Sequence, residues 1–197
     1  LEGHLKIIRK EFPNALLSID TFHSEIAKMA VDNGVNIIND ISGGAFDKEM
    51  FKTVAQLKIP YILMHIQGTP QNMQNNPHYD NVVSEIITYF NHKINQLREL
   101  DIQDIIIDPG FGFGKTVEHN FELLDNLTMF SIFNLPILVG VSRKSMIYKV
   151  LGVNPDKALN GTTVIQTVAL LKGANIIRVH DVKEAVESIK LLSNLQH

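Results

Sequence analysis

Short apolar runs that end in polar residues recur along the chain, and each is followed by a loop and a helical pattern. The runs are almost continuously apolar and do not alternate, which is typical of strands buried on both faces of a parallel sheet. The predicted strands are Leu16–Asp20, Asn36–Asp40, Tyr61–His65, Ile105–Asp108, Ile137–Val141 and Ile176–His180.

Apolar positions spaced three and four residues apart predict helices between these strands. A stripe from Ile26 to Val31 stops at Asn33-Gly34, and a long stripe runs from Val82 to Leu97. The helix before the last strand is expected to bury Val164, Val168 and Leu171. The final helix is expected to bury Val182, Val186, Ile189 and Leu192.

The pattern therefore contains about six βα units, preceded by a helix whose apolar positions include Leu5 and Phe12. Six parallel strands are compatible with an open doubly wound sheet or with part of a closed barrel. Because every predicted strand ends in polar residues, we favour a (β/α)8 TIM barrel, in which all carboxyl ends meet at one mouth. A complete barrel needs roughly 250 residues. We therefore interpret the chain as one that lacks the first two strands, with a cut N-terminus.

Composition bounds the possible functions. The 197 residues contain no break or linker, so we predict a single domain over residues 1–197. The net charge of −3 gives no basic surface for nucleic acid or an anionic membrane. No apolar run reaches the ~20 residues of a membrane span. The absence of cysteine fits a reducing, cytoplasmic compartment.

The polar strand ends combine carboxylates and an amide with basic groups. The first set comprises Asp20, Asn39 and Asp108, and the second comprises Lys144, Arg178 and His180. Carboxylates and an amide can pair with a heterocycle rich in N–H groups, whereas arginine binds an anion through two parallel N–H donors. Arg178 and His180 are two positions apart on a predicted strand and should point the same way. The pattern predicts a ligand with a heterocyclic end and an anionic end.

Two features of the same strand ends favour ordinary structural roles. Asp40 and Asp181 directly follow strands, where carboxylates most often cap helices or hold loops. The run Gly110–Thr116 is similar to a phosphate-binding loop, but Pro109 stands where that motif requires glycine. We therefore predict no nucleotide triphosphatase, although the glycines would still let the backbone approach a ligand.

Taken together, these segments resemble dihydropteroate synthases, the family of pterin-binding barrels, in order and spacing across essentially the whole chain. The motifs that carry the resemblance are Ser18-Ile19-Asp20-Thr21, Ile38-Asn39-Asp40, Met64-His65 with Gly68-Thr69-Pro70, Asp108 to Phe113, Gly140 to Ser145 and Arg178 to Val182. The resemblance implies a transferase that condenses 6-hydroxymethyl-7,8-dihydropterin diphosphate with p-aminobenzoate. The products are 7,8-dihydropteroate and pyrophosphate, in folate biosynthesis, and sulfonamides are inhibitors that mimic p-aminobenzoate.

The resemblance also implies roles for individual residues. The catalytic set is Asp20, Asp108, Lys144, Arg178 and His180. The pterin-binding set is Asp20, Asn39, Ile41, Ile62, Met64, Asp108, Gly140, Lys144 and Arg178. Arg178 and His180 would bind pyrophosphate, and Phe113, Lys144 and Ser145 would bind p-aminobenzoate.

The resemblance further implies a Mg²⁺ cofactor and a homodimer. It implies no metal ligand in this chain, because the family's magnesium ligand and its closing loop belong to the first two strands. We therefore expect the parent protein to be active and the chain alone to be impaired. A methyltetrahydrofolate-dependent methyltransferase and a non-catalytic pterin-binding protein are the two alternatives.

Overall fold

The computed structural model describes residues 1–195, and it contains all six predicted strands. Strands β1 (Ser18–Asp20), β2 (Ile37–Asp40), β3 (Tyr61–Met64) and β4 (Ile105–Asp108) form one sheet in chain order. Strands β5 (Leu138–Val139) and β6 (Ile176–Ile177) form a second, parallel pair. The contacts divide the chain into two compact units, Leu1–His65 with Tyr89–Ile107, and Ile66–Thr88 with the chain from Asp108 onward. The prediction of one domain remains a prediction.

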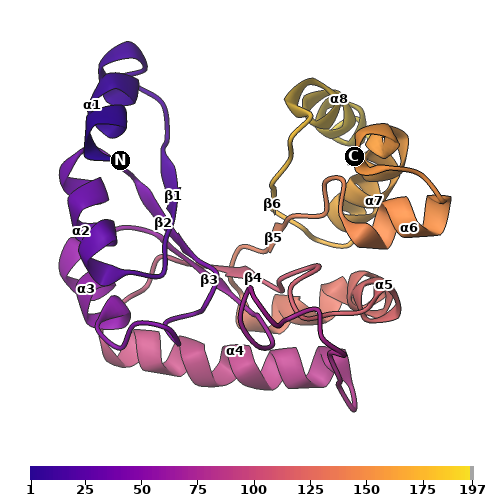
Figure 1. Ribbon diagram of the computed structural model, residues 1–197, viewed down its shortest axis with the longest axis horizontal. Coiled ribbons are helices and arrows are strands. Elements are labelled where there is room, and N and C mark those ends of the chain that lie inside the picture. The colour runs from indigo at the N-terminus through magenta and orange to yellow at the C-terminus, as the bar shows by residue number, and fades with distance from the viewer. Residues whose placement is uncertain (196–197) are drawn as a thin grey trace. The chain divides into compact units, whose positions relative to one another are not determined.

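The first unit is built on the four-stranded sheet. Helices α1 (Glu2–Glu11), α2 (Ser24–Asp32) and α3 (Met50–Leu57) follow one another along strands β1 to β3 (Figure 1). Helix α4 (Val82–Glu99) begins in the second unit and continues into the first. Strand β3 is buried along its whole length, as its continuous apolar run predicts. Strand β1 is buried only at Ile19, because it is the edge strand of this sheet and has a neighbour on one side alone.

Arg9 connects helix α1 to the amino ends of the first two strands. Its guanidinium donates hydrogen bonds to the carbonyl oxygen of Ala15 at 2.8 Å and to Oδ1 of Asn36 at 3.0 Å. It also donates to the carbonyl oxygen of Gly34. Asn36 Oδ1 in turn accepts from the backbone N–H of Leu17. These bonds satisfy acceptors of the loops that precede β1 and β2.

The second unit contains helices α5 (Val117–Asp125), α6 (Ser145–Leu151), α7 (Leu159–Leu171) and α8 (Val182–Leu192). The short 3₁₀ helices η1 (Leu127–Phe133) and η2 (Pro155–Lys157) connect them. Thr116 caps α5, because its side chain accepts from the N–H of His119 while the His119 ring accepts from the N–H of Thr116. Helices α6, α7 and α8 gather in the orange-to-yellow part of Figure 1.

The predicted buried faces of α7 and α8 are wrong at most positions. Helix α7 buries Thr162, Gln166 and Ala169, whereas Val164 and Leu171 are 53% and 65% exposed. Helix α8 buries Ala185 and Ser188 and exposes most of its valine and isoleucine side chains. Gln166 Nε2 donates to Oγ of Ser188 at 3.3 Å, so the two helices pack through small and polar groups that satisfy each other. Hydrophobic periodicity alone could not reveal a contact of this kind.

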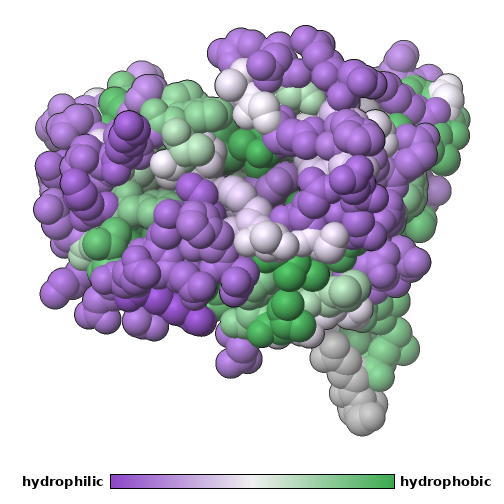
Figure 2. All heavy atoms as spheres, turned by 90° about the horizontal axis from the view of Figure 1, so that it is seen from below, coloured by the Kyte–Doolittle hydropathy of each residue, from purple (hydrophilic) through white to green (hydrophobic). Residues whose placement is uncertain are grey.

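The surface carries the apolar groups that these helices expose. On the face drawn in Figure 2, hydrophobic atoms lie in patches among hydrophilic ones. Among residues 1–195, no helix is long and apolar enough to cross a membrane.

Candidate functional site

The register of the first sheet places three predicted site residues side by side. Asp20 pairs with Asn39, and Asn39 pairs with Ile62 on the next strand. Paired residues of neighbouring strands point to the same face of a sheet, so these three side chains share one face. Met64, two residues after Ile62, belongs to that face as well, and both side chains are buried. Ile41 directly follows β2 and is partly exposed.

Asn39 and Asp20 form a polar pair on that face. The Nδ2 group of Asn39 donates a hydrogen bond to Oδ1 of Asp20. Asn39 is only 1% exposed, and its Oδ1 atom has no hydrogen-bond partner among the described residues. A buried acceptor without a donor carries a desolvation cost that a bound N–H group would remove. The pair therefore offers an acceptor and a carboxylate to a ligand that carries N–H donors.

Asp40 lies on the opposite face and holds the loop that follows β2. Its carboxylate accepts from the N–H and Oγ of Ser42, from the N–H of Gly44 and from the hydroxyl of Tyr61 at 2.8 Å. Burial, together with the negative charge of Asp40, raises the pKa of Tyr61 well above its usual value. The interpretation of Asp40 as a loop carboxylate is confirmed. Its bonds to Ser42 and Gly44 hold the loop that follows β2.

The second unit contains a buried carboxylate surrounded by cations. Asp108 ends β4, is 4% exposed and accepts from the N–H of Gly110 at 2.8 Å. Burial raises the pKa of Asp108, although the positive charges of Lys144, Arg178 and Lys115 act in the opposite direction. Such a carboxylate is stabilised by any ligand that donates hydrogen bonds to it.

Lys144 is the N-cap residue of α6, and its side chain extends into the glycine-rich loop. Its ammonium group donates to the carbonyl oxygen of Phe111 and lies 4.7 Å from the centre of the Phe113 ring. Burial lowers the pKa of Lys144 to about 8, with Asp108 opposing the shift. A side chain at Gly112 would approach Cδ of Lys144 to 3.1 Å, so glycine leaves the path of the lysine open.

The ends of β5 and β6 are tied together by two side-chain contacts. Nδ1 of His180 lies 2.9 Å from Oγ of Ser142, and Arg143 forms a two-point ion pair with Asp181 at 2.9 and 2.8 Å. Asp181 is thus held by an ion pair and makes no side-chain cap of α8. Strand β6 ends at Ile177, so Arg178 and His180 follow the strand, and the expected strand geometry does not apply to them. Gly140 lies beside Arg178 and Lys144, since a Cβ added there would be in ordinary van der Waals contact with both side chains.

Two basic residues at these loops were not assigned from the sequence. Arg143 has a left-handed φ of 54° and also donates to the carbonyl oxygens of Pro155 and Asp156, which fixes the loop that carries Lys144 and Ser145. Lys115 is 2% exposed and donates to the carbonyl oxygens of Gly110 and Phe113. A lysine directly after a run of glycines is the available signal in the sequence, although the same pattern also resembles a nucleotide motif.

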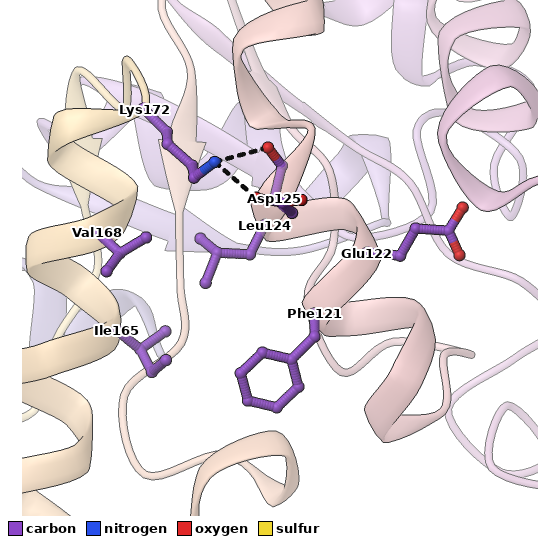
Figure 3. A pocket seen from close by; sticks show the side chains of 7 residues that line it. All are labelled: Phe121, Glu122, Leu124, Asp125, Ile165, Val168 and Lys172. Carbon is purple, nitrogen blue, oxygen red and sulfur yellow. Dashed lines mark hydrogen bonds and ion pairs between the residues drawn. The ribbon is translucent and has the colours of Figure 1, made fainter.

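A cavity of about 500 Å³ lies between α5 and α7 and contains none of the predicted site residues (Figure 3). At one end, Nζ of Lys172 contacts Oδ1 of Asp125 at 2.8 Å, and the carboxylate of Glu122 points away from the apolar side chains. The lining residues are Phe121, Glu122, Leu124, Asp125, Ile165, Val168 and Lys172. The cavity is thus mainly apolar, and the charged strand ends lie elsewhere.

The fold and the polar strand ends define an α/β protein whose parallel strands present acid, amide and basic groups at their carboxyl ends. A family model described as "pterin binding enzyme" matches residues 1–180. The chain belongs to this family of pterin-binding enzymes, and several of the curated and solved proteins that it matches are named dihydropteroate synthases. The family resemblance seen in the sequence motifs is therefore confirmed.

Three comparisons illustrate the match. The chain is 42% identical over 178 residues to dihydropteroate synthase of Escherichia coli, covering 89% of this chain and 63% of that relative. The structure of the Yersinia pestis enzyme in a sulfonamide drug complex matches with a TM-score of 0.94 and 36% identity, over 99% of this chain and 71% of that one. The Xanthomonas albilineans enzyme in complex with 7,8-dihydropteroate matches with a TM-score of 0.91 and 31% identity, over 100% of this chain and 72% of that one.

These matches confirm the α/β TIM-barrel class that the sequence predicts. The chain spans less than two thirds of the length of the Escherichia coli relative.

Proposed function

We propose that the chain carries the pterin-binding machinery of a dihydropteroate synthase. The reaction breaks the C–O bond between the pterin methylene and the diphosphate, and the bonding electrons leave with pyrophosphate. The amine of p-aminobenzoate then forms the new C–N bond and loses a proton, which gives 7,8-dihydropteroate. The observation that carries the proposal is the buried Asp108 carboxylate with Lys144 beside it, on a chain of the pterin-binding family.

Asp108 and Lys144 have complementary roles toward the heterocycle in this proposal. The carboxylate of Asp108 accepts hydrogen bonds from the amino and ring N–H groups of the pterin. The ammonium of Lys144, which reaches into the loop after β4, donates to the pterin carbonyl. Gly140 lies next to both basic residues, because a Cβ added there would be 3.9 Å from Nζ of Lys144 and 3.7 Å from Cβ of Arg178, and it is proposed to line the pterin site.

Asp20 and Asn39 are proposed to act on the same substrate through the face that they share on the first sheet. Departure of the diphosphate leaves positive charge on the pterin, and a fixed carboxylate stabilises that charge. The buried Oδ1 of Asn39 supplies an acceptor for a pterin N–H group. Ile41, Ile62 and Met64 supply apolar contacts to the ring, and the burial of Ile62 and Met64 in β3 supports this assignment.

Arg178 and His180 are proposed to bind the diphosphate. Negative charge accumulates on the leaving group as the C–O bond breaks, so cations fixed near it lower the barrier. The contact between His180 and Ser142 supports this role, because it orients the imidazole ring.

Magnesium is proposed as the cofactor on the strength of the resemblance. Within residues 1–195, no group of three or more His, Asp or Glu side chains could hold a metal ion. We assign no step of the reaction to the ion.

Phe113, Lys144 and Ser145 are proposed to bind p-aminobenzoate. The Phe113 ring provides a flat apolar surface, and Ser145 begins α6, where backbone N–H groups and a hydroxyl favour a carboxylate. The amine of p-aminobenzoate is a neutral nucleophile at physiological pH, so the reaction requires no strong general base. Sulfonamides would compete at the same place.

The proposed setting is a cytoplasmic homodimer. The exposed apolar side chains of α7 and α8 support an interface between two copies, because exposed patches of this kind are otherwise costly in water. The absence of cysteine supports a reducing compartment. We propose no nucleic-acid or membrane partner.

The test is turnover with pterin diphosphate, labelled p-aminobenzoate and magnesium, measured beside pterin binding by calorimetry. Formation of dihydropteroate is the expected result for the protein at the length of its relatives. Pterin binding without turnover at that length would favour the non-catalytic alternative. Methyl transfer from methyltetrahydrofolate would favour the methyltransferase, and absence of any pterin binding would refute the proposal.

A further inference from the structure

The glycine-rich loop Gly110–Gly114 is held by side chains at every carbonyl group. Its three glycines have φ angles of 71°, 79° and 63°, which are left-handed conformations outside any regular element. The five carbonyls in chain order accept hydrogen bonds from Lys115, Lys144, Gln74, Lys115 again and Tyr79. Side-chain donors, and not a backbone ladder, therefore determine where this loop lies.

Lys115 donates to two of these carbonyls. Its ammonium lies 2.9 Å from the oxygen of Gly110 and 3.1 Å from the oxygen of Phe113. Phe113 N–H also donates to the oxygen of Gly110, so the lysine closes a turn that already has one backbone bond. Gly110 is anchored to Asp108 through its N–H group. Lys115 thus links Gly110, the anchored first residue of the loop, to Phe113.

Burial of the Lys115 ammonium costs free energy, which suggests that its contacts with the two carbonyls contribute to function. Lys115 is 2% exposed, and burial lowers its pKa to about 7, with Asp108 opposing the shift and Lys144 adding to it. A buried ammonium is tolerated only where acceptors replace water. A methionine would fill a similar volume without that cost, but it could not bridge the two carbonyls.

We propose that Lys115 is a positioning residue that holds the Phe113 ring in place for the aminobenzoyl half of the ligand. This inference rests on the proposed function, in which Phe113 packs on that half. Lys115 acts through the loop, and the ligand contacts remain those of Phe113 and Lys144. Loss of the bridge frees the carbonyl of Phe113 and lets the ring leave the ammonium of Lys144, which it faces at 4.7 Å.

The test compares two ligands that differ by the aminobenzoyl half, 6-hydroxymethyl-7,8-dihydropterin and 7,8-dihydropteroate. Their dissociation constants are measured by calorimetry for the wild type, Lys115→Met, Phe113→Leu and the double variant. Lys48→Met, which changes an exposed lysine of the first unit, is the matched control. Thermal melting and circular dichroism check the fold of each variant.

Lys115→Met is expected to bind the pterin with wild-type affinity and to lose about tenfold in affinity for dihydropteroate. Phe113→Leu should show the same selective loss, and the double variant should be little worse than either single one, because both act through one ring. If Lys115→Met does not fold, Lys115→Gln replaces it, because glutamine keeps an N–H donor on a shorter side chain. The same selective loss of affinity for dihydropteroate is expected.

Three outcomes would overturn the inference. The first is equal affinity of Lys115→Met and the wild type for dihydropteroate. The second is an equal loss of affinity for both ligands in Lys115→Met. The third is a loss of dihydropteroate affinity in the double variant that equals the sum of the two single losses. A wild-type protein that binds neither ligand would instead refute the proposed function itself, so the two failures are distinguishable.

Discussion

The ammonium group of Lys144 lies 4.7 Å from the centre of the Phe113 ring and donates a hydrogen bond to the neighbouring carbonyl of Phe111. A lysine at the start of α6 is therefore part of the same small structure as the loop after β4. In the proposed reaction, this residue contacts both substrates. The relationship makes Lys144 the most informative position for a first substitution.

Lys144→Met is expected to weaken pterin binding and to remove its alkaline pH dependence. The pKa of Lys144 is about 8, so the wild-type side chain loses its positive charge as the pH rises through that value. Wild-type affinity should fall between about pH 7 and pH 9, because the charged ammonium donates the stronger hydrogen bond. Calorimetric titrations across this range would show a sloping wild-type profile and a flat profile for the variant. A sloping profile in both proteins would contradict the assignment.

Asp108→Asn is expected to weaken pterin binding by about ten- to a hundredfold, the range for losing hydrogen bonds to a charged group. Asparagine has nearly the same shape and can still accept from the N–H of Gly110, so the fold should be retained. Binding measured beside a denaturant titration separates the two effects. Unchanged affinity in both Asp108→Asn and Lys144→Met would refute the pterin assignment of these residues.

The sequence predicted the six strands and the polar residues at the ends of β1, β2 and β4, because both depend on local order, whereas β6 ends before Arg178 and His180. Parallel strands bring their carboxyl ends to one edge, so the sequence alone groups Asp20 with Asn39, and the two residues are paired in the sheet. The role of Asp40 was also predictable, because the alternation of side chains along β2 places it opposite Asn39. The roles of individual residues in binding remain predictions.

The sequence could not predict contacts that depend on packing between elements. Thr162, Gln166 and Ser188 form the buried faces of α7 and α8, although apolar residues were expected there. Gln166 donates to Ser188, and Thr162 accepts from the backbone N–H of Arg143, and hydrophobic periodicity contains no information on such contacts. The contacts of Lys115 are not predictable for a similar reason, because its partners are backbone carbonyls that any sequence would supply.

The exposed apolar face of α7 leads to a prediction about assembly. Leu171→Asp, on a side chain that is 65% exposed, should shift a homodimer toward monomer if this face forms the interface. Ile7→Asp, at an equally exposed isoleucine of α1, should leave the assembly unchanged. Sedimentation velocity over a range of concentrations measures both. A wild-type protein that is monomeric at all concentrations would contradict the proposed dimer.

Lys115 should make stability depend on pH in the direction opposite to that of a lysine whose pKa is raised by an ion pair. Its pKa of about 7 in the folded protein lies below the unfolded value of roughly 10.4. Between these values the unfolded chain binds more protons, so the contribution of Lys115 to stability rises with pH. The free energy of unfolding in urea should be measured for both proteins at pH 7 and pH 9. Relative to Lys115→Met, the wild type should be more stable at pH 9 than at pH 7. A difference between the two proteins that does not change with pH would refute the prediction.

Gly43 provides a test of the framework that holds the end of β2. Its φ is 57°, and an added Cβ would lie 1.9 Å from the hydroxyl oxygen of Tyr89, a side chain that itself donates to the carbonyl of Met64. Gly43→Ala should therefore lower the free energy of unfolding by more than about 2 kcal/mol, through left-handed strain and overpacking together.

Gly152 offers a matched control for that substitution. It has a similar φ of 63°, but nothing lies within 4 Å of its added Cβ. Gly152→Ala should show the conformational cost alone, roughly 1 kcal/mol. Tyr89→Phe removes the hydroxyl that the new methyl group would meet, so it should restore part of the stability of Gly43→Ala while slightly destabilising the wild type. Equal losses of unfolding free energy for Gly43→Ala and Gly152→Ala in urea titrations would contradict this prediction. They would mean that the loop after β2 moves to accommodate the methyl group and that Tyr89 does not fix its position.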